Sequence, residues 1–216
     1  MFFAQRLILV EGLEDTAYLT AYLQLSGRWE DYRRLGCHMI PVGGKDQLIQ
    51  PLAIAKALNI PTVVVFDSDA DKYGTIDAAA DPEGKLAARR PMHLRDNTAI
   101  LKLCGITTPD PFPAEALFHD SVVLWHSEIG SVVEEDIGAQ DWRECKTQAE
   151  RELGQPGGLE KNVLQIALRL AKAWDAGKRS THLDQACDRI LNTARPAVAQ
   201  PALQILTQAA QAHHAP

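Results

Sequence analysis

Four short apolar runs in the first 125 residues have the length and composition of buried β-strands. They span Arg6–Val10, Cys37–Val42, Thr62–Asp67 and Ser121–Trp125. Apolar runs of this length, without polar alternation, are typical of strands covered on both faces, as in a parallel sheet. Helical spacing of apolar residues follows the first two runs, over residues 13–25 and 48–58. This alternation predicts an α/β fold with a parallel sheet and right-handed crossovers.

The pattern changes after Gly138, beyond which only helical spacing remains. We expect helices over residues 142–153, 159–174, 182–191 and 201–212, separated by breaks rich in Gly and Pro. Ahead of this region, the sequence predicts a polar, mobile surface segment over residues 71–91 and a helix over residues 93–104. The expected organisation is an α/β domain at residues 1–138, followed by a small all-helical domain at residues 139–216.

The charge balance limits how this chain can meet nucleic acid. With 28 acidic and 22 basic residues, the formal net charge is −6, so nucleic-acid binding requires a local basic strip or metal ions. The four cysteines form no CxxC pair, which predicts neither a zinc site nor disulfides and suits a reducing cytoplasm. The apolar opening reaches Glu11 too early for a signal peptide or a membrane span, so no membrane partner is expected.

Acidic residues follow three of the four predicted strands. Glu11 follows the first, Asp67 and Asp69 end the third, and Glu128 comes shortly after the fourth. The carboxyl ends of parallel strands meet at one edge of a sheet, and Asp15 on the first turn of the next helix can point back to that edge. Crowded carboxylates repel one another unless a cation lies between them, and oxygen ligands favour Mg²⁺, Mn²⁺ or Ca²⁺. The sequence therefore predicts a site for one or two divalent ions.

Other side chains are weaker candidates for this site. The side chain of Glu14 is expected to face away if Asp15 faces the site. Ser68 can offer only its backbone carbonyl, because strand alternation points its side chain to the opposite side. Additional acidic candidates are Asp71, Glu134, Glu135 and Asp136, of which the last three are also explained as a solvated helix face.

Basic residues near the same edge are candidates for contact with a phosphate backbone. Lys45 follows Gly43 and Gly44, although a glycine pair is equally explained by close helix–sheet packing. The remaining candidates, in the polar segment after the third strand, are Lys72, Lys85, Arg89 and Arg90.

Two other acidic motifs share part of this pattern. An EF-hand calcium loop is excluded, because Lys72 stands where the turn needs Gly and Ala78 where the bidentate Glu is needed. A strand followed by Asp-x-Asp also opens the haloacid-dehalogenase-type phosphatases, in which Asp67 would be the nucleophile. Against that reading, Asp71 replaces the usual Thr or Val, and two strand–helix units come first.

Three motifs in order resemble the Toprim domain of topoisomerases, primases, recombination mediators and OLD-type nucleases. They are Glu11-Gly12 after the first strand, Gly43-Gly44-Lys45 after the second, and Asp67-x-Asp69 after the third. With the helical region that follows, the chain looks most like the C-terminal nuclease region of class 2 OLD (overcoming lysogenization defect) proteins. The resemblance implies a Rossmannoid parallel sheet flanked by helices, with a small helical domain after it.

The resemblance also implies roles for individual residues. Glu11, Asp67 and Asp69 would bind Mg²⁺, a second acid on the first helix matches Asp15, and a lysine of the helical region matches Lys161. Lys161 is equally explained as a solvated lysine at the start of a helix. These nucleases usually show an acid, a hydrophobic residue and then Glu after the fourth strand. Here Glu128-Ile129-Gly130 leaves Gly in the last place, so Glu128 becomes the expected ligand.

The function expected from these observations is Mg²⁺- or Mn²⁺-dependent cleavage of DNA by a two-metal mechanism. Glu11, Asp67 and Lys161 would be catalytic, and Ca²⁺ would substitute without supporting catalysis. Full-length relatives carry an N-terminal ABC-type ATPase, and no P-loop motif GxxxxGK[ST] occurs in this chain. A non-catalytic Toprim DNA-binding module remains the alternative, beside the phosphatase.

Overall fold

A five-stranded sheet forms the centre of the computed structural model, which describes residues 5–77, 79, 81–154 and 161–193. The strand order is β2-β1-β3-β5-β4. The strands are β1 (Arg6–Val10), β2 (Cys37–Pro41), β3 (Thr62–Asp67), β4 (Leu117–His119) and β5 (Val122–Trp125). All pairs are parallel except β4 with β5, which is antiparallel. The predicted α/β fold is confirmed, and the carboxyl ends of β1, β3 and β5 lie at one edge.

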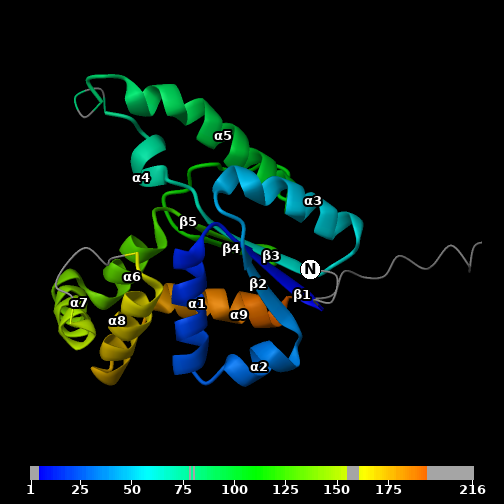
Figure 1. Cartoon of the computed structure of the whole chain (residues 1–216). Coiled ribbons are helices and arrows are strands. Elements are labelled where there is room, and N and C mark those ends of the chain that lie inside the picture. The colour runs from blue at the N-terminus through cyan, green and yellow to red at the C-terminus, as the bar shows by residue number, and fades with distance from the viewer. Residues whose placement is uncertain (1–4, 78, 80, 155–160, 194–216) are drawn as a thin grey trace, which may run out of the picture.

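Helices cover both faces of this sheet (Figure 1). In chain order they are α1 (Leu13–Leu25), α2 (Trp29–Arg34), the 3-10 helix η1 (Lys45–Leu48), α3 (Ile49–Ala57), α4 (Ala70–Tyr73), α5 (Lys85–Leu103), α6 (Ile129–Ile137), α7 (Ala139–Leu153), α8 (Val163–Asp175) and α9 (Thr181–Asn192). The α3 and α5 helices pack on one face, whereas α1, α6 and α9 pack on the other.

Side-chain alternation along the strands explains the two layers. On β3, Val63 and Val65 join the core under α1, whereas Val64 and Phe66 join the core under α3 and α5. Successive side chains of a strand point to opposite faces, so a strand buried on both sides must be apolar throughout. The same alternation holds for β5, where Val123 faces the α1 side.

The helices after residue 138 share their core with the sheet. Trp142 of α7 is 1% exposed, and its ring lies 6.4 Å from that of Tyr18 on α1. Ile166 and Leu170 of α8 belong to the same buried cluster as the apolar residues of β1 and β5. The division into domains at residues 1–138 and 139–216 stays a prediction.

Several elements differ from their predicted bounds. The helix expected over residues 93–104 begins at Lys85 and includes Pro91, so part of the segment predicted as irregular is helical. Helix α2 and strand β4 were not predicted, because six- and three-residue elements carry too little periodicity. The helix predicted over residues 201–212 lies outside the described residues. Among the described residues, no helix has the length and apolar character needed to cross a membrane.

Candidate metal centre

Two carboxylates, each with one buried oxygen, meet at the ends of neighbouring strands. Glu11 directly follows β1, and Asp67 is the last residue of β3, which pairs in parallel with β1 up to Val10 and Val65. Oε2 of Glu11 and Oδ1 of Asp67 are buried, and neither has a hydrogen-bond partner among the described residues. Buried acceptors of this kind are costly, since they have lost water and gained no donor.

Asp15 brings a third carboxylate to this edge from the first turn of α1. Its Oδ2 accepts a hydrogen bond from the backbone N–H of Gly12 at 2.8 Å, and the residue is 5% exposed. Burial raises the pKa of Asp15 to about 7, with a further contribution from Glu11. Burial likewise raises the pKa of Asp67 well above its usual value, and the charges of Asp15 and Glu11 add to this shift. The expected position of Asp15 beside Glu11 and Asp67 is therefore what the structure shows.

Burial also raises the pKa of Glu11, and the Asp69 carboxylate adds to the shift, although Lys45 opposes it. The pKa values of three neighbouring carboxyl groups are thus all raised. Raised pKa values at one edge are the electrostatic signature of a site that lacks sufficient positive charge.

Asp69 differs, because three basic side chains surround it. Its Oδ2 lies 2.6 Å from Nζ of Lys45 and 3.3 Å from Nδ1 of His93, and its Oδ1 lies 3.3 Å from Nζ of Lys72. Burial alone raises the pKa of Asp69, but Lys45 and the other two side chains outweigh it, so the pKa is lowered. The backbone at Asp69 has φ 57°, in the left-handed region that Asp tolerates better than most residues.

Lys45 and His93 join the site from different elements. Lys45 begins η1 after Gly43 and Gly44, which have φ 90° and 147°, and its side chain is 7% exposed. His93 of α5 stacks on the ring of Tyr73, with 4.0 Å between the centroids. Nothing in the sequence pattern pointed to His93, because only the packing of α5 brings it to the strand edge.

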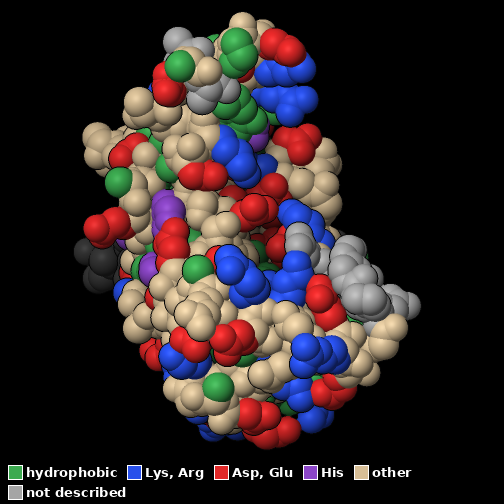
Figure 2. Space-filling view, turned by 90° about the vertical axis from the view of Figure 1, so that its left-hand side faces the viewer, with side chains coloured by type: hydrophobic (Ala, Val, Ile, Leu, Met, Phe, Trp, Pro, Cys, Tyr) green, Lys and Arg blue, Asp and Glu red, His purple; other side chains and the backbone are tan. Residues whose placement is uncertain are grey.

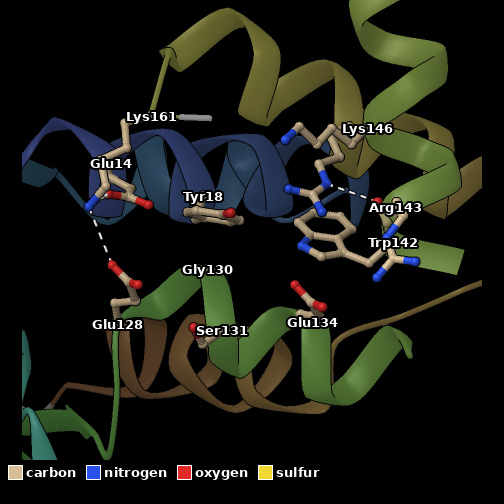
Figure 3. A pocket seen from close by; sticks show the side chains of 11 residues that line it. Glu14, Tyr18, Glu128, Gly130, Ser131, Glu134, Trp142, Arg143, Lys146 and Lys161 are labelled. Carbon is tan, nitrogen blue, oxygen red and sulfur yellow. Dashed lines mark hydrogen bonds and ion pairs between the residues drawn. The ribbon is translucent and has the colours of Figure 1, made fainter. Parts of the chain in front are cut away.

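Glu128 and Lys161 form a second part of the site, which Figure 3 shows from close by. Nζ of Lys161 lies 3.3 Å from Oε2 of Glu128 and 3.2 Å from Oε2 of Glu14. Although partial burial lowers the pKa of Lys161, the two glutamates outweigh it and raise this pKa. Glu14 does face away from the Asp15 side, as expected, but it faces Lys161 rather than solvent alone. Sequence reasoning missed this role, although Glu14 directly precedes Asp15.

The weaker acidic candidates are dispersed. Ser68 is fully buried, and its carbonyl accepts a hydrogen bond from Asn97 at 2.9 Å. Asp71 is exposed on α4, and Glu135 pairs with His126 at 3.2 Å. Asp136 instead anchors the start of α9, whereas Glu134 lines a cleft beside Glu128.

The basic candidates flank the acidic edge unevenly. Lys45 and Lys72 contact Asp69, whereas Lys85 pairs with Glu83 and Arg89 is exposed on α5. Arg90 donates from Nε to the carbonyl of Tyr73 at 2.8 Å. Figure 2 shows Asp and Glu side chains gathered in the middle of this face, with Lys and Arg side chains above and below them. Positive charge therefore borders an acidic centre.

The donor set suits a hard divalent ion. Carboxylate oxygens predominate at the strand edge, and two of them are buried without a partner among the described residues. Within the described part of the chain, no three acidic, His or Cys side chains already surround one point as ligands. Asp69 is directed to Lys45 and Asp15 to Gly12, which accounts for this geometry.

Comparison with known proteins bears on this arrangement. Residues 2–69 match the family described as "Overcoming lysogenization defect protein-like, TOPRIM domain". Among curated proteins, no sequence matches the chain. A solved structure of the C-terminal region of the Xanthomonas campestris pv. campestris OLD protein, phased with platinum, is 15% identical, with a TM-score of 0.53 over 99% of each chain. The same region phased with mercury is 19% identical, covers 99% of this chain and 100% of that one, and has a TM-score of 0.45.

The platinum-phased structure has a similar fold, and the family match spans the strand ends that carry Glu11, Asp67 and Asp69. Residues 2–69 therefore match the OLD-like Toprim family, and the chain has the fold of the OLD C-terminal region.

Proposed function

We propose that this chain is a metal-dependent nuclease that hydrolyses DNA phosphodiester bonds. The observation that carries the proposal is the pair of buried, unpartnered oxygens of Glu11 and Asp67 at adjacent strand ends. Two such oxygens within an acidic cluster destabilise the ion-free protein, and a bound cation would offset this cost. The match to the OLD-like Toprim family supports a nuclease rather than another use of the cation.

Glu11, Asp15, Asp67 and Asp69 would hold one ion or share two, with Glu128 as the ligand nearest the fourth parallel strand end. Bound Mg²⁺ or Mn²⁺ supplies a water of lowered pKa for attack and charge to stabilise the leaving 3′-oxygen. Ca²⁺ would fit the same oxygens as a non-productive substitute, because it takes longer and less regular coordination.

The side chain of Lys161 would stabilise charge on the scissile phosphate. It is tethered by Glu14 and Glu128, so its ammonium group is held beside the acidic edge rather than moving freely in solvent. A preoriented positive charge stabilises developing negative charge without reorganisation during the reaction. Its own side chain is 70% exposed, which leaves it accessible to a polymeric substrate.

Basic residues of α4 and α5 would position the DNA backbone. Lys72 and Arg89 lie on these elements at the border of the acidic face, and contacts to phosphates fix register without reading sequence. Lys45 is buried against Asp69, so it supports the carboxylate cluster more directly than it supports DNA. An N-terminal ABC-type ATPase is the expected partner domain, and the four buried free thiols suit a reducing cytoplasm.

A plasmid-nicking assay tests this proposal. The wild-type chain with Mg²⁺ or Mn²⁺ is expected to convert supercoiled DNA to nicked or linear forms, and Asp67→Asn is expected to lose this activity. Asp71→Asn is the matched control, since Asp71 is an exposed acid on the adjacent helix. Undiminished cleavage by Asp67→Asn would overturn the proposal.

Two outcomes would favour the alternatives. DNA binding without cleavage under any divalent ion would indicate a non-catalytic Toprim module. Turnover of p-nitrophenyl phosphate, with an acyl-phosphate on Asp67 detected by mass spectrometry after rapid quench, would indicate a phosphatase.

A further inference from the structure

A polar cleft of about 350 Å³ lies between α1, α6, α7 and α8, next to the candidate metal centre (Figure 3). Its lining combines three glutamates with four basic side chains, two aromatic rings, a glycine and a serine. These residues are Glu14, Tyr18, Glu128, Gly130, Ser131, Glu134, Trp142, Arg143, Lys146, Lys161 and Arg169. The volume is within the range of small-molecule sites, and a mainly charged lining suits a charged ligand.

Charge is unevenly distributed along this cleft. Glu14, Glu128 and Lys161 lie together at one end, whereas Lys146 and Arg143 lie at the other (Figure 3). The two glutamates hold Lys161 between them, so two acidic side chains face one basic side chain at this end. At the other, positive end, three basic side chains lie beside one further glutamate, Glu134, and one of them, Lys146, also pairs with Glu150 at 3.9 Å.

Arg169 is held rigidly at the positive end. Its guanidinium lies 3.7 Å from the centre of the Trp142 ring, and its Nε donates to the Trp142 carbonyl at 3.0 Å. The residue is only 9% exposed. A guanidinium that is stacked and hydrogen-bonded is preorganised, so binding an anion costs it little further side-chain entropy.

Tyr18 supplies an independent indication that the cleft takes a ligand. The residue is 2% exposed, yet its hydroxyl lines the cleft and forms no hydrogen bond with any described residue. Buried tyrosine hydroxyls usually find a partner. A donor positioned in this way can be satisfied by a ligand oxygen.

Gly130 keeps the space beside this hydroxyl open. A Cβ atom at position 130 would lie 3.2 Å from the hydroxyl oxygen of Tyr18 and 3.6 Å from Oε1 of Glu14. Gly130 lies in the first turn of α6, where an N–H-rich helix end also favours an anion. Gly130 is the residue that stands where the acid–hydrophobic–Glu pattern expects Glu. A longer side chain at this position would enter the cleft.

We propose that this cleft binds a backbone phosphate of the DNA strand next to the phosphate that is cleaved. This inference rests on the proposed nuclease function. The acidic end adjoins the metal centre, because Glu14 precedes Asp15 and Glu128 follows β5, the strand paired with β3. A strand whose scissile phosphate lies at the carboxylates would then place the neighbouring phosphate between Tyr18 and Arg143. Guanidinium and hydroxyl donors match phosphate oxygens.

Three substitutions test the cleft. Arg143→Gln removes a charge from its positive end, Tyr18→Phe removes only the hydroxyl, and Gly130→Ala fills the space beside it. Arg151→Gln is the matched control for the first, since Arg151 is also exposed on α7 but does not line the cleft. Thermal melting of each variant checks folding, and Gly130→Ala is expected to keep its helix because Ala favours helix over Gly.

The measurement is fluorescence anisotropy of a labelled oligonucleotide in EDTA, at several KCl concentrations. Without divalent ions no cleavage occurs, so binding is read alone. Arg143→Gln is expected to weaken binding and to lower the slope of log K against log [salt] by about 1, the effect of losing one phosphate contact. Gly130→Ala and Tyr18→Phe are expected to weaken binding at every salt concentration, and Arg151→Gln to behave as wild type. Unchanged affinity and slope in both Arg143→Gln and Gly130→Ala would overturn the proposal.

Competition identifies the source of the phosphate. Inorganic phosphate and dAMP are expected to displace the oligonucleotide only at millimolar concentrations, if the cleft recognises one phosphate within a strand. Displacement by micromolar dAMP would overturn the proposal in favour of a free-nucleotide site. Failure of the nuclease proposal would appear separately, as absent nicking by the wild-type chain with Mg²⁺ or Mn²⁺.

Discussion

Glu11 and Asp67 end neighbouring parallel strands, and each buries a carboxylate oxygen that has no hydrogen-bond partner among the described residues. Both groups also have raised pKa values, because burial and neighbouring carboxylates disfavour their charged forms. The ion-free site is therefore a source of instability. Replacing one of these two carboxylates should raise the stability of the ion-free protein and lower its activity.

Asp67→Asn is expected to stabilise the ion-free protein while abolishing cleavage. The amide removes a buried charge that lacks compensation, so the midpoint of thermal unfolding in EDTA should rise by about 2–4 °C for each kcal/mol gained. Cleavage should fall by at least about 100-fold, since even indirect supports of metal sites cost 10- to 100-fold when removed. Mn²⁺ should raise the melting temperature of the wild type but not of the variant. A lower melting temperature for Asp67→Asn in EDTA would contradict this account.

Lys161→Met is expected to lower the rate of cleavage without changing stability. Loss of a preoriented positive charge should cost on the order of 100-fold in rate. Because its side chain is 70% exposed, its pairs with Glu14 and Glu128 contribute little to folding. Single-turnover cleavage and urea unfolding measure the two effects. The control is Lys172→Met, which breaks the pair of the half-buried Lys172 with the exposed Glu152 away from the site. Equal rates for the two variants would argue against a catalytic role for Lys161.

Lys45→Met should destabilise the ion-free protein, because it leaves Asp69 buried without its closest counter-charge. Removing one partner of a buried ion pair costs about 3–5 kcal/mol, and Lys72 and His93 should reduce that cost here. Divalent ions should recover more stability in this variant than in the wild type. Urea unfolding without Mn²⁺ measures the loss of stability, and urea unfolding with Mn²⁺ measures how much of it the ion recovers. The double substitution with Asp69→Asn should restore most of the loss, and a purely additive effect would show that the two side chains are not coupled.

Asp136→Asn should lower stability in a manner that depends on pH. Burial tends to raise the pKa of Asp136, but hydrogen bonds from Ser180, His182 and Thr181 outweigh this and lower it below the ordinary 3.8. A depressed folded-state pKa stabilises the protein above the unfolded value and loses that contribution as pH falls through the folded value. The difference in unfolding free energy between wild type and variant should therefore be about 1–3 kcal/mol at pH 7 and smaller at pH 3. A difference that does not change with pH would exclude this mechanism.

The strand edge was predictable because it depends only on chain order. Parallel strands bring their carboxyl ends to one edge of the sheet, so Glu11 and Asp67 were expected at the same edge. That they are direct neighbours follows from the strand order, in which β1 lies beside β3. It was harder to predict which of the neighbouring acids Glu14 and Asp15 on α1 faces the site. Successive residues of a helix point about 100° apart, and the rotation of α1 is fixed by distant contacts such as that of Tyr18 with Trp142.

Long-range pairing also explains what sequence reasoning missed. Asp136 was a candidate ligand, but it caps a helix that begins 45 residues later in the chain, at Thr181. His93 reaches Asp69 only because α5 packs beside the strand edge. Neither relationship leaves a local pattern, since both depend on which elements come to lie side by side.

At Asp69, the backbone conformation and the side chain favour different residues. Glycine would adopt φ 57° without the roughly 1 kcal/mol that an L-residue loses in this region. The turn by itself would be better served by glycine, so Asp69→Gly should relieve backbone strain even as it removes the acid held by Lys45. Asp at this position costs more backbone energy than Gly would. The carboxylate of Asp69, and not the conformation of the loop, therefore explains why the residue is Asp.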